Sequence, residues 1–267
     1  MKFTLVTISY NQAEYLEEAI NSVLQQEYKN IEYIIVDPGS TDGSRKIIKK
    51  YSDRITKIIL EPDNGPADAL NKGFKYATGD IYGFLNSDDL LMPGAISTVA
   101  NEFLKYPNID VISGSCMIIN DKSSVIRRAF SDNFNKYMSA YSACILIQPS
   151  TFFKSAAYLS TNGFNPENKS NWDSELYIDM ALKNAKFKNI DNLLSCYRVH
   201  KQSITGSKRL EDLHKIHDER MFIKITKRKP NVLDKLIKIF ARYSRKLINP
   251  KDTVERIMHG SIFGNYK

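Results

Sequence analysis

Two adjacent carboxylates, Asp88 and Asp89, follow an apolar stretch that ends at Leu85. Like charges side by side repel each other, so we expect a cation or hydrogen-bond donors to share them. Oxygen ligands with net negative charge suit Mg²⁺ or Mn²⁺, and Mg²⁺ usually takes its remaining oxygens from a bound diphosphate. The alternative is a solvated turn in which Asp89 caps the helix that begins at Pro93.

The elements that position this pair follow from a regular alternation of apolar runs and helical patterns. Four short apolar runs are typical of buried strands, at residues 3–8, 31–36, 55–60 and 81–85. A first helix is expected up to Leu24, with Asn11 and Glu14 placed as its cap and N3 partner. The helices expected after it span residues 44–51, 66–76 and 93–106.

This alternation predicts an α/β fold with a mostly parallel, Rossmann-like sheet and helices on both faces. Ligands of such sheets collect at the carboxyl ends of the strands. Polar residues follow each of the four expected strands, after Ile8, Val36, Leu60 and Leu85. The sequence therefore predicts one site at that edge of the sheet.

The second half of the chain is less regular. A polar loop is expected over residues 131–142, and helical sequence from about Ser207 to Lys246, interrupted at Pro230. The other expected elements are strands at 111–119, 124–130 and 193–199, a short apolar segment at 150–153 and a helix at 173–183.

Composition and charge limit the classes of protein. The 267 residues carry a net charge of +8, but residues 222–251 hold ten Lys or Arg and one acidic residue, Asp234. The remainder is nearly neutral, which argues against a nucleic-acid-binding protein. No long uncharged apolar run and no signal peptide are apparent, and the three cysteines have neither metal nor disulfide spacing, so a cytoplasmic protein is expected. No phosphate-binding glycine motif occurs either.

Several motifs together resemble the family 2 inverting glycosyltransferases, which have the GT-A fold. The motifs are Thr7-Ile-Ser-Tyr-Asn11, Val36-Asp-Pro-Gly-Ser-Thr-Asp-Gly-Ser44, Glu61-Pro-Asp-Asn-Gly65, Asp68-Ala-Leu-Asn-Lys-Gly73, Asn86-Ser-Asp-Asp89, Trp172-Asp-Ser-Glu-Leu176 and Tyr197-Arg-Val-His200 with Ser203-Ile-Thr205. The resemblance implies a catalytic domain over residues 1–206, with a nucleotide-binding half (1–106) and an acceptor-binding half (107–206). Residues 207–267 would form a basic, amphipathic helical extension.

The resemblance implies a nucleotide site at the ends of the first four strands. Asp37 would accept a hydrogen bond from the ring N–H of uracil, and Asp88 would face the ribose. Many relatives have Asp or Gly where this chain has Pro38, which stiffens the loop without affecting Asp37. The other residues implied to face the nucleotide are Thr7, Ser9, Tyr10, Asp68 and Asn71. For Asp68 and Asn71 the alternative is an ordinary helix surface.

The resemblance also implies the metal ligands and the catalytic base. Asp89 would bind Mn²⁺ or Mg²⁺, with His200 as a further ligand or, alternatively, a surface histidine. Asp173 falls where the family has its general base, and Glu175 is the rival candidate. Because residues two positions apart on a helix point to different faces, only one of them should reach the acceptor, and we choose Asp173. The residues implied to contact the acceptor or diphosphate are Trp172, Lys201, Ser203 and Thr205. Trp172 would otherwise be a core residue.

The function implied is the transfer of a sugar from a UDP-sugar to a glycan or lipid-linked acceptor in the synthesis of a bacterial surface polysaccharide such as a capsule or O-antigen. A sugar nucleotidyltransferase would normally carry a Gly-rich basic loop after the first strand, where this chain has Ser9-Tyr-Asn-Gln12. A non-catalytic, basic protein that binds a membrane or a polymer is the second alternative. Against this second alternative, the carboxylates at the four strand ends would form a poor surface for an anionic polymer.

The basic segment, residues 222–251, predicts a peripheral contact with the inner face of the cell membrane. Leu233, Leu236, Ile237 and Phe240, with Tyr243 or Ala241, fall on one stripe of a helix whose other positions are rich in Lys and Arg. Such a helix suits an anionic membrane interface. The alternative is that the stripe packs on the catalytic domain or on a second subunit.

Overall fold

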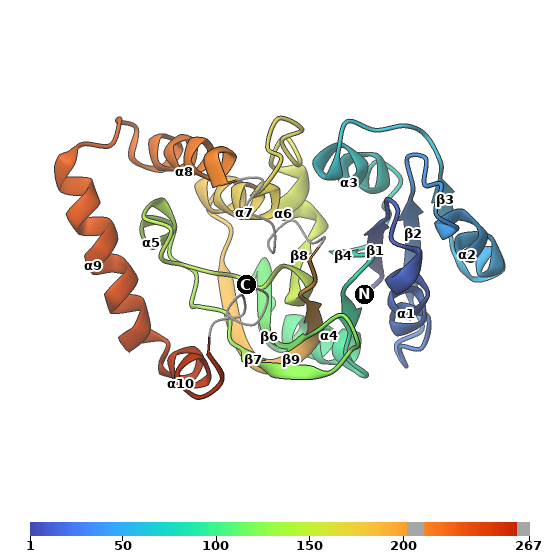
Figure 1. Ribbon diagram of the computed structural model, residues 1–267. Helices are drawn as coiled ribbons and strands as arrows, with labels where there is room; N and C mark the ends of the chain where they lie inside the picture. The colour runs from blue at the N-terminus through green and yellow to red at the C-terminus, as the bar shows by residue number, and fades with distance from the viewer. Residues whose placement is uncertain (202–210, 261–267) are drawn as a thin grey trace.

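The computed structural model describes residues 1–201 and 211–260. Within these residues the chain forms one nine-stranded sheet with helices on both faces (Figure 1). Its first four strands are parallel neighbours in the order β3-β2-β1-β4. These strands are β1 (Phe3–Ile8), β2 (Ile31–Val36), β3 (Lys57–Ile59) and β4 (Ile81–Asn86). The parallel arrangement expected for the first half is therefore confirmed.

The rest of the sheet is mixed and curls around the end of β4. β8 (Thr151–Lys154) runs antiparallel between β4 and β6 (Val111–Ile119). β9 (Phe187–Arg198) lies parallel to β6, while β7 (Val125–Ala129) and β5 (Leu90–Leu91) are antiparallel additions to β6 and β9. The β5–β9 pairing brings the end of β9 beside the segment that follows β4.

Helices cover both faces of this sheet, and two apolar cores result. One core joins the sheet to α1 (Ala13–Leu24), α2 (Ser44–Lys50) and α4 (Ala95–Lys105). The other joins it to α3 (Pro66–Phe74), α6 (Ser155–Leu159) and α7 (Trp172–Leu182). The 3₁₀ helices are η1 (Ser52–Arg54) and η2 (Gln148–Ser150), and α5 (Lys136–Ala140) lies within the segment expected to be a polar loop.

Three helices end the described chain and form the edge of the molecule away from β1–β3 (Figure 1). They are α8 (Glu211–Thr226), α9 (Val232–Ile248) and α10 (Pro250–His259). The expected interruption near Pro230 is present between α8 and α9. None of the helices described is long and apolar enough to cross a membrane.

The first helix begins differently from the expectation. Its N-cap is Gln12, which makes no capping bond through its side chain. Asn11 instead has a positive φ of 51°, and its side-chain oxygen accepts a hydrogen bond from the Thr41 N–H at 2.9 Å. The predicted Asn11 cap was wrong, because the Asn11 side chain ties the end of β1 to the loop that follows β2.

Candidate active site

A cavity of about 630 Å³ opens at the carboxyl ends of the parallel strands. Residues after β1, β2 and β4 line one part of it, and residues from η2, α7 and the end of β9 line another. The polar lining includes Ser9, Tyr10, Asp63, Asn86, Asp88, Asp89, Gln148, Ser170, Asp173 and Arg198. The predicted single site at this edge of the sheet is thus present as a cavity.

The acidic pair lies in the turn that follows β4. Asp89 is 1% exposed, and its Oδ1 accepts a hydrogen bond from the Arg198 backbone N–H at 2.9 Å. The helix that follows is capped by Gly94, so the alternative of a solvated turn with Asp89 as a cap was wrong. Asp88 is more exposed, and its Oδ2 lies 3.0 Å from His200 Nε2.

Arg198 holds this turn from the end of β9. Its Nε donates to the Asp88 carbonyl oxygen at 2.7 Å, and its Nη2 contacts Glu18 Oε2 at 2.6 Å. The guanidinium also donates to the Asn120 carbonyl oxygen and to the Ser123 hydroxyl. Because Arg198 is only 1% exposed, its charge offsets the buried negative charge of the turn at short range.

Arg198 does not fully compensate the two carboxylates of the Asp88–Asp89 turn. Burial and the neighbouring Asp88 carboxylate raise the pKa of Asp89 well above its ordinary value, although the Arg198 N–H and Asn86 act in the opposite sense. A divalent cation would remove this repulsion, and two carboxylates with an imidazole nearby are suitable ligands. In the described part of the chain no three such side chains converge as a ready-made metal site. A cation bound here would need further oxygen ligands from water or from a bound ligand.

Asp37 carries a buried acceptor that is unused. Its side chain is fully buried at the end of β2, next to Pro38, which lines the cavity. Oδ1 accepts from the Gly39 and Ser40 N–H groups at 3.1 and 2.8 Å and from Arg45 Nε at 3.1 Å. Oδ2 has no hydrogen-bond partner among the described residues. A buried acceptor without a donor costs free energy, so this oxygen is suited to a ligand N–H.

Further unpartnered acceptors belong to the cavity lining itself. Ser9 Oγ, Asp63 Oδ2 and Ser170 Oγ are buried and find no partner within the part of the chain that the structure describes. Burial raises the pKa of Asp63 above its ordinary value, while the Gly65 N–H bound to its other oxygen lowers it. The cavity therefore offers hydrogen-bonding atoms suited to a polar ligand.

Asp173 lies at the start of α7 and lines the cavity beside Trp172. Burial raises the pKa of Asp173 above its ordinary value, and backbone N–H groups only partly offset this. A carboxylate with a raised pKa is a better general base near neutral pH. Trp172 is 7% exposed and also packs in the core with Leu176, so it serves both the core and the cavity wall.

Glu175 points away from this cavity. It is 3% exposed, and its carboxylate is bound by Asn168 at 2.7 Å and by Arg220 at 2.6 Å. Asn165 and Lys224 bind the other oxygen at 3.2 and 3.3 Å. Burial alone would raise the pKa of Glu175, but these partners hold it below its ordinary value. Glu175 therefore joins α7 to α8, which favours Asp173 over Glu175 as the candidate base.

Three other residues expected at the nucleotide make hydrogen bonds within the protein. Thr7 is fully buried and its hydroxyl lies 3.0 Å from that of Tyr33, away from the lining. Asn71 donates to the Phe164 carbonyl oxygen and accepts from the Phe164 N–H and the Tyr158 hydroxyl. Asp68 accepts from the Asn64 N–H at 2.9 Å. These contacts hold loops that surround the cavity.

The last expected group is only partly described. Lys201 is exposed and follows His200, which is 4% exposed and lies against the Tyr15 ring at 4.9 Å between ring centroids. Ser203 and Thr205 lie outside the described residues. The diphosphate role expected for these residues stays a prediction.

Two site residues were missed from the sequence. Gln148 Nε2 donates to the Phe84 carbonyl oxygen at 2.7 Å, and Gln148 Oε1 accepts from Asn86 at 3.0 Å. Arg198 lies in the same motif as His200, but the motif did not predict that Arg198 holds the acidic turn. The one available signal was a charged residue inside an otherwise apolar strand end, which requires buried partners.

The chain is similar in sequence to known glycosyltransferases. The protein-family model described as "Glycosyl transferase family 2" matches residues 4–162. An uncharacterized glycosyltransferase of Nostoc sp. is 28% identical over 210 residues, which are 75% of this chain and 65% of that protein. The chondroitin synthase of Pasteurella multocida is 27% identical over 213 residues, 78% of this chain and 22% of the synthase. The chain thus matches less than two thirds of the length of these relatives.

Solved structures share the fold at low sequence identity. S. aureus TarS residues 1–349 in complex with UDP-GlcNAc gives a TM-score of 0.67 at 17% identity, covering 97% of this chain and 73% of TarS. The mannosyltransferase PcManGT of Pyrobaculum calidifontis, in complex with GDP-Man and Mn²⁺, gives 0.65 at 18% identity, covering 97% and 73% of the two chains. The family match spans more than half of the chain and includes β1, β2 and β4, at whose ends the cavity opens, so the chain belongs to glycosyltransferase family 2, with a GT-A fold.

Proposed function

We propose that this protein is an inverting glycosyltransferase that moves a hexosyl or N-acetylhexosaminyl group from a UDP-sugar to a hydroxyl of a glycan or lipid-linked acceptor. The observation that carries the proposal is one cavity that contains both the Asp88–Asp89 turn and Asp173, a carboxylate whose pKa burial raises. Catalysis is assigned to residues 1–206, with the nucleotide held by 1–106 and the acceptor by 107–206. Residues 207–267 are assigned as a helical extension.

The unused acceptor of Asp37 supports uracil as the base of the donor. Its buried Oδ2 suits a ring N–H, which uracil has and cytosine lacks. Ser9 and Tyr10 line the cavity that Pro38, next to Asp37, also lines, and they complete the proposed base and ribose site together with Asp88. The likeness to TarS in complex with UDP-GlcNAc is consistent with this choice.

A divalent cation, Mn²⁺ or Mg²⁺, is proposed at the acidic turn. Asp89 and His200 are the proposed protein ligands, and the raised pKa of Asp89 is the observation that favours a cation there. When bound, the cation would stabilise the charge that develops on the departing diphosphate. Lys201, Ser203 and Thr205 are proposed to contact the same diphosphate.

The mechanism assigns one proton transfer to the protein. Asp173 accepts the proton of the acceptor hydroxyl while that oxygen attacks the anomeric carbon from the face opposite the nucleotide. Trp172 provides an apolar wall beside Asp173 against which a sugar ring packs. The bond from the anomeric carbon to the diphosphate oxygen breaks in the same displacement, which inverts the configuration.

The biological role we propose is the synthesis of a bacterial surface polysaccharide, such as a capsule or an O-antigen. Relatives whose names concern polysaccharides support it: the chondroitin synthase above, and a Bacillus subtilis protein named as a putative teichuronic acid biosynthesis glycosyltransferase, which is 43% identical over 89 residues, 32% of this chain and 35% of that protein.

Nucleotide binding tests the donor site directly. The melting temperature of the full chain is measured with UDP, GDP, CDP and dTDP, each with Mn²⁺ and with EDTA. We expect the largest rise with UDP plus Mn²⁺ and its loss with EDTA, because a ligand that binds only the folded state stabilises it. Release of UDP from UDP-sugars, measured in the same buffers, then tests transfer. Absence of a shift with every nucleotide would refute the proposal.

A further inference from the structure

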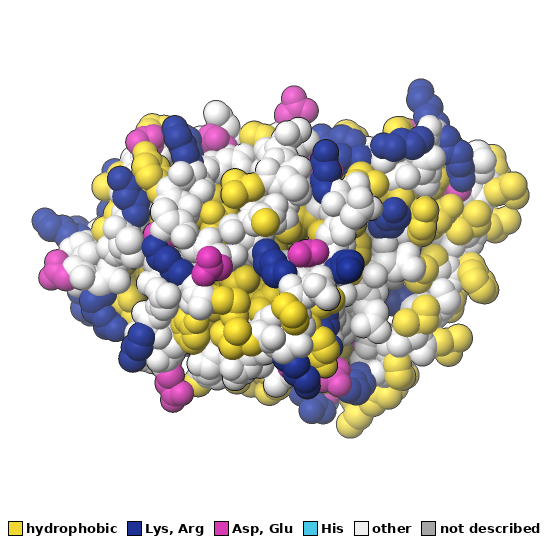
Figure 2. All heavy atoms as spheres, turned by 180° about the vertical axis from the view of Figure 1, so that it is seen from behind, with side chains coloured by type: hydrophobic (Ala, Val, Ile, Leu, Met, Phe, Trp, Pro, Cys, Tyr) yellow, Lys and Arg dark blue, Asp and Glu magenta, His cyan; other side chains and the backbone are white. Residues whose placement is uncertain are grey.

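The helix α9 carries its apolar residues on the outside of the protein. Leu236 is 63% exposed, Phe240 74% and Leu247 83%. Figure 2 shows hydrophobic side chains that project along the edge formed by the C-terminal helices. The other large apolar residues exposed on α9 and α10 are Val232, Leu233, Ile237, Ile239, Tyr243, Ile248, Val254, Ile257 and Met258. A helix at the surface of a water-soluble domain normally turns this face inward.

Polar contacts hold α9 in this orientation. Asp234 is 5% exposed, forms a two-armed ion pair with Arg228 at 2.6 and 2.7 Å, and accepts from the Tyr141 hydroxyl at 3.0 Å. Lys238 reaches Asp218 on α8 at 3.1 Å. The inward face of α9 is thus charged, apart from the buried Ala241.

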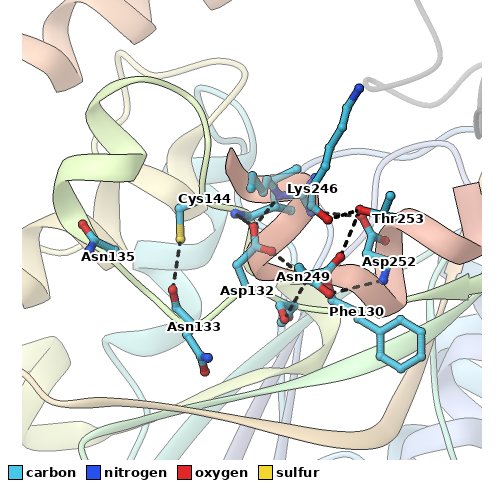
Figure 3. A network of polar contacts seen from close by, with 12 residues as sticks. Phe130, Asp132, Asn133, Asn135, Cys144, Lys246, Asn249, Asp252 and Thr253 are labelled. Carbon is cyan, nitrogen blue, oxygen red and sulfur yellow. Dashed lines mark hydrogen bonds and ion pairs between the residues drawn. The ribbon is translucent and has the colours of Figure 1, made fainter. Parts of the chain in front are cut away.

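The corner between α9 and α10 is anchored in the same way. Arg245 contacts Asp132 at 2.6 Å and Asp252 at 3.1 Å. Asn249 donates to Asp132 at 2.7 Å and to the Phe130 carbonyl oxygen at 3.1 Å. Figure 3 shows this network, and it shows the Lys246 side chain extending away from it. Because these groups are largely buried, rotating α9 to hide its apolar face would expose or break a whole polar network.

Only part of the basic segment, residues 222–251, presents an exposed apolar face. Phe222 and Ile225 of α8 are 4% and 8% exposed and pack in a core cluster with Ile178 of α7, so α8 has no free apolar face at these residues. Tyr243, 63% exposed, lies with the outward residues of α9, whereas Ala241 lies inward. The alternative that the stripe packs on the catalytic domain is wrong for the described chain, since the stripe faces solvent.

Charge identifies the partner of this face. Lys235, Arg242 and Lys246 are exposed on α9, and the Lys246 ammonium lies over the Tyr243 ring at 4.8 Å. The acidic residues of α9 and α10, Asp234, Asp252 and Glu255, are all buried. The outward face therefore combines apolar and basic side chains without an acidic residue. A second copy docked through the same face would offer no carboxylate to the basic residues.

We propose that α9, with the adjacent outward residues of α10, docks this protein on an anionic lipid membrane. The apolar side chains would enter the interface between headgroups and acyl chains, and Lys235, Arg242 and Lys246 would contact lipid phosphates. Such docking would make the protein peripheral to the membrane, in agreement with the contact with the inner face of the cell membrane that the sequence predicts. The inference goes beyond glycosyl transfer and does not depend on it.

Vesicle sedimentation of the full chain tests this surface without any measurement of activity. The wild type should pellet with vesicles that contain phosphatidylglycerol and much less with pure phosphatidylcholine. The variant Leu236→Glu/Phe240→Glu should lose binding by roughly tenfold or more for each side chain. Its matched control is Leu104→Glu/Leu159→Glu, which alters two residues that are 68% and 70% exposed on other helices. The control should bind like the wild type.

A second variant tests the contribution of the basic residues of α9 to vesicle binding. Lys235→Gln/Arg242→Gln/Lys246→Gln should lower the partition constant roughly fivefold per residue, and raising the salt concentration should reproduce this loss in the wild type. Circular dichroism verifies that each variant is folded. Equal pelleting of the wild type and Leu236→Glu/Phe240→Glu would overturn the proposal. So would a self-association of the wild type, seen by sedimentation equilibrium, that this variant abolishes while vesicle binding stays unchanged.

Discussion

The carboxylate of Asp88 lies 3.0 Å from His200 Nε2, across the junction between the turn after β4 and the end of β9. Arg198 strengthens the same junction, since its backbone N–H binds Asp89 and its side chain binds the Asp88 carbonyl oxygen. Two segments more than a hundred residues apart in the sequence are thereby joined at one turn. A ligand at the acidic turn would therefore lie next to the contacts that hold the end of β9 and His200.

Replacement of His200 should weaken cation binding. We expect His200→Ala to require a roughly 10- to 100-fold higher Mn²⁺ concentration for half-maximal activity, whether the imidazole binds the cation or orients Asp88. The measurement is activity titrated with Mn²⁺ after EDTA treatment. His259→Ala, at an exposed histidine of α10, is the control and should behave like the wild type. An unchanged Mn²⁺ titration of His200→Ala would remove His200 from the cation site.

Asp173→Asn should abolish most of the activity and keep the donor site. Loss of a general base lowers the rate by roughly 10²- to 10⁴-fold. The affinity for UDP, measured by calorimetry, should stay within about twofold because the proposed mechanism has Asp173 contact the acceptor hydroxyl and not the nucleotide. A variant that keeps most of its activity would show that another group is the base.

Glu175→Gln is the matched control for that experiment. It lies two positions further along α7, but its carboxylate binds Arg220 and Lys224. We expect a loss of stability of about 1–3 kcal/mol in urea unfolding, with the turnover of the folded enzyme largely kept. A stable but inactive Glu175→Gln would instead favour Glu175 as the base.

The pH dependence of the reaction should report the environment of Asp173. Its pKa is raised, so kcat/KM should rise with pH through a value above that of an ordinary aspartate and level off once Asp173 is ionised. The stability of the folded protein should change in the opposite direction and fall as pH increases. The reason is that the pKa of Asp173 is higher in the folded than in the unfolded state, so ionising this carboxyl costs folding free energy. The melting temperature of Asp173→Asn, relative to that of the wild type, should therefore increase as the pH is raised from acidic to neutral. An acid limb at the ordinary aspartate pKa would contradict this.

Local patterns predicted the first half of the fold because strand and helix periodicity is set by neighbouring residues. The acidic turn and Asp173 were found for a related reason, since each lies in a short motif at the end of one element. The role of Arg198 could not be found this way, because its partners Glu18 and Asp88 come from distant segments. The direction of the α9 stripe likewise depends on ion pairs with Asp132 and Asp218, which no helical pattern contains.

Asn71 has partners within the protein that its motif did not indicate. It was expected at the nucleotide, but its side chain makes three hydrogen bonds, two with the backbone of Phe164 and one with the Tyr158 hydroxyl. Asn71→Ala should lower the free energy of unfolding by about 2–3 kcal/mol, because the partly buried groups of Phe164 lose their partners. Its UDP affinity, measured below the unfolding transition, should stay within about twofold. A stable variant with weak UDP binding would restore the nucleotide role.

Asp37→Asn should change which base the donor site accepts. Oδ1 receives hydrogen bonds from Gly39, Ser40 and Arg45, so the amide of the variant should place its oxygen there. The amide nitrogen then occupies the position of Oδ2 and presents a donor in place of an acceptor. Uracil N3–H would face this donor, whereas cytosine has an acceptor at the same ring position.

We therefore expect UDP affinity to fall by roughly 10- to 100-fold and CDP to gain relative to UDP, as measured by calorimetry with both nucleotides. Asp53→Asn, at an exposed aspartate of η1, controls for the change in net charge and should leave both affinities unaltered. Because the prediction concerns a ratio, a general weakening of the loop would lower both affinities together and would not produce it. An unchanged ratio of UDP to CDP affinity would show that Asp37 Oδ2 does not contact the base.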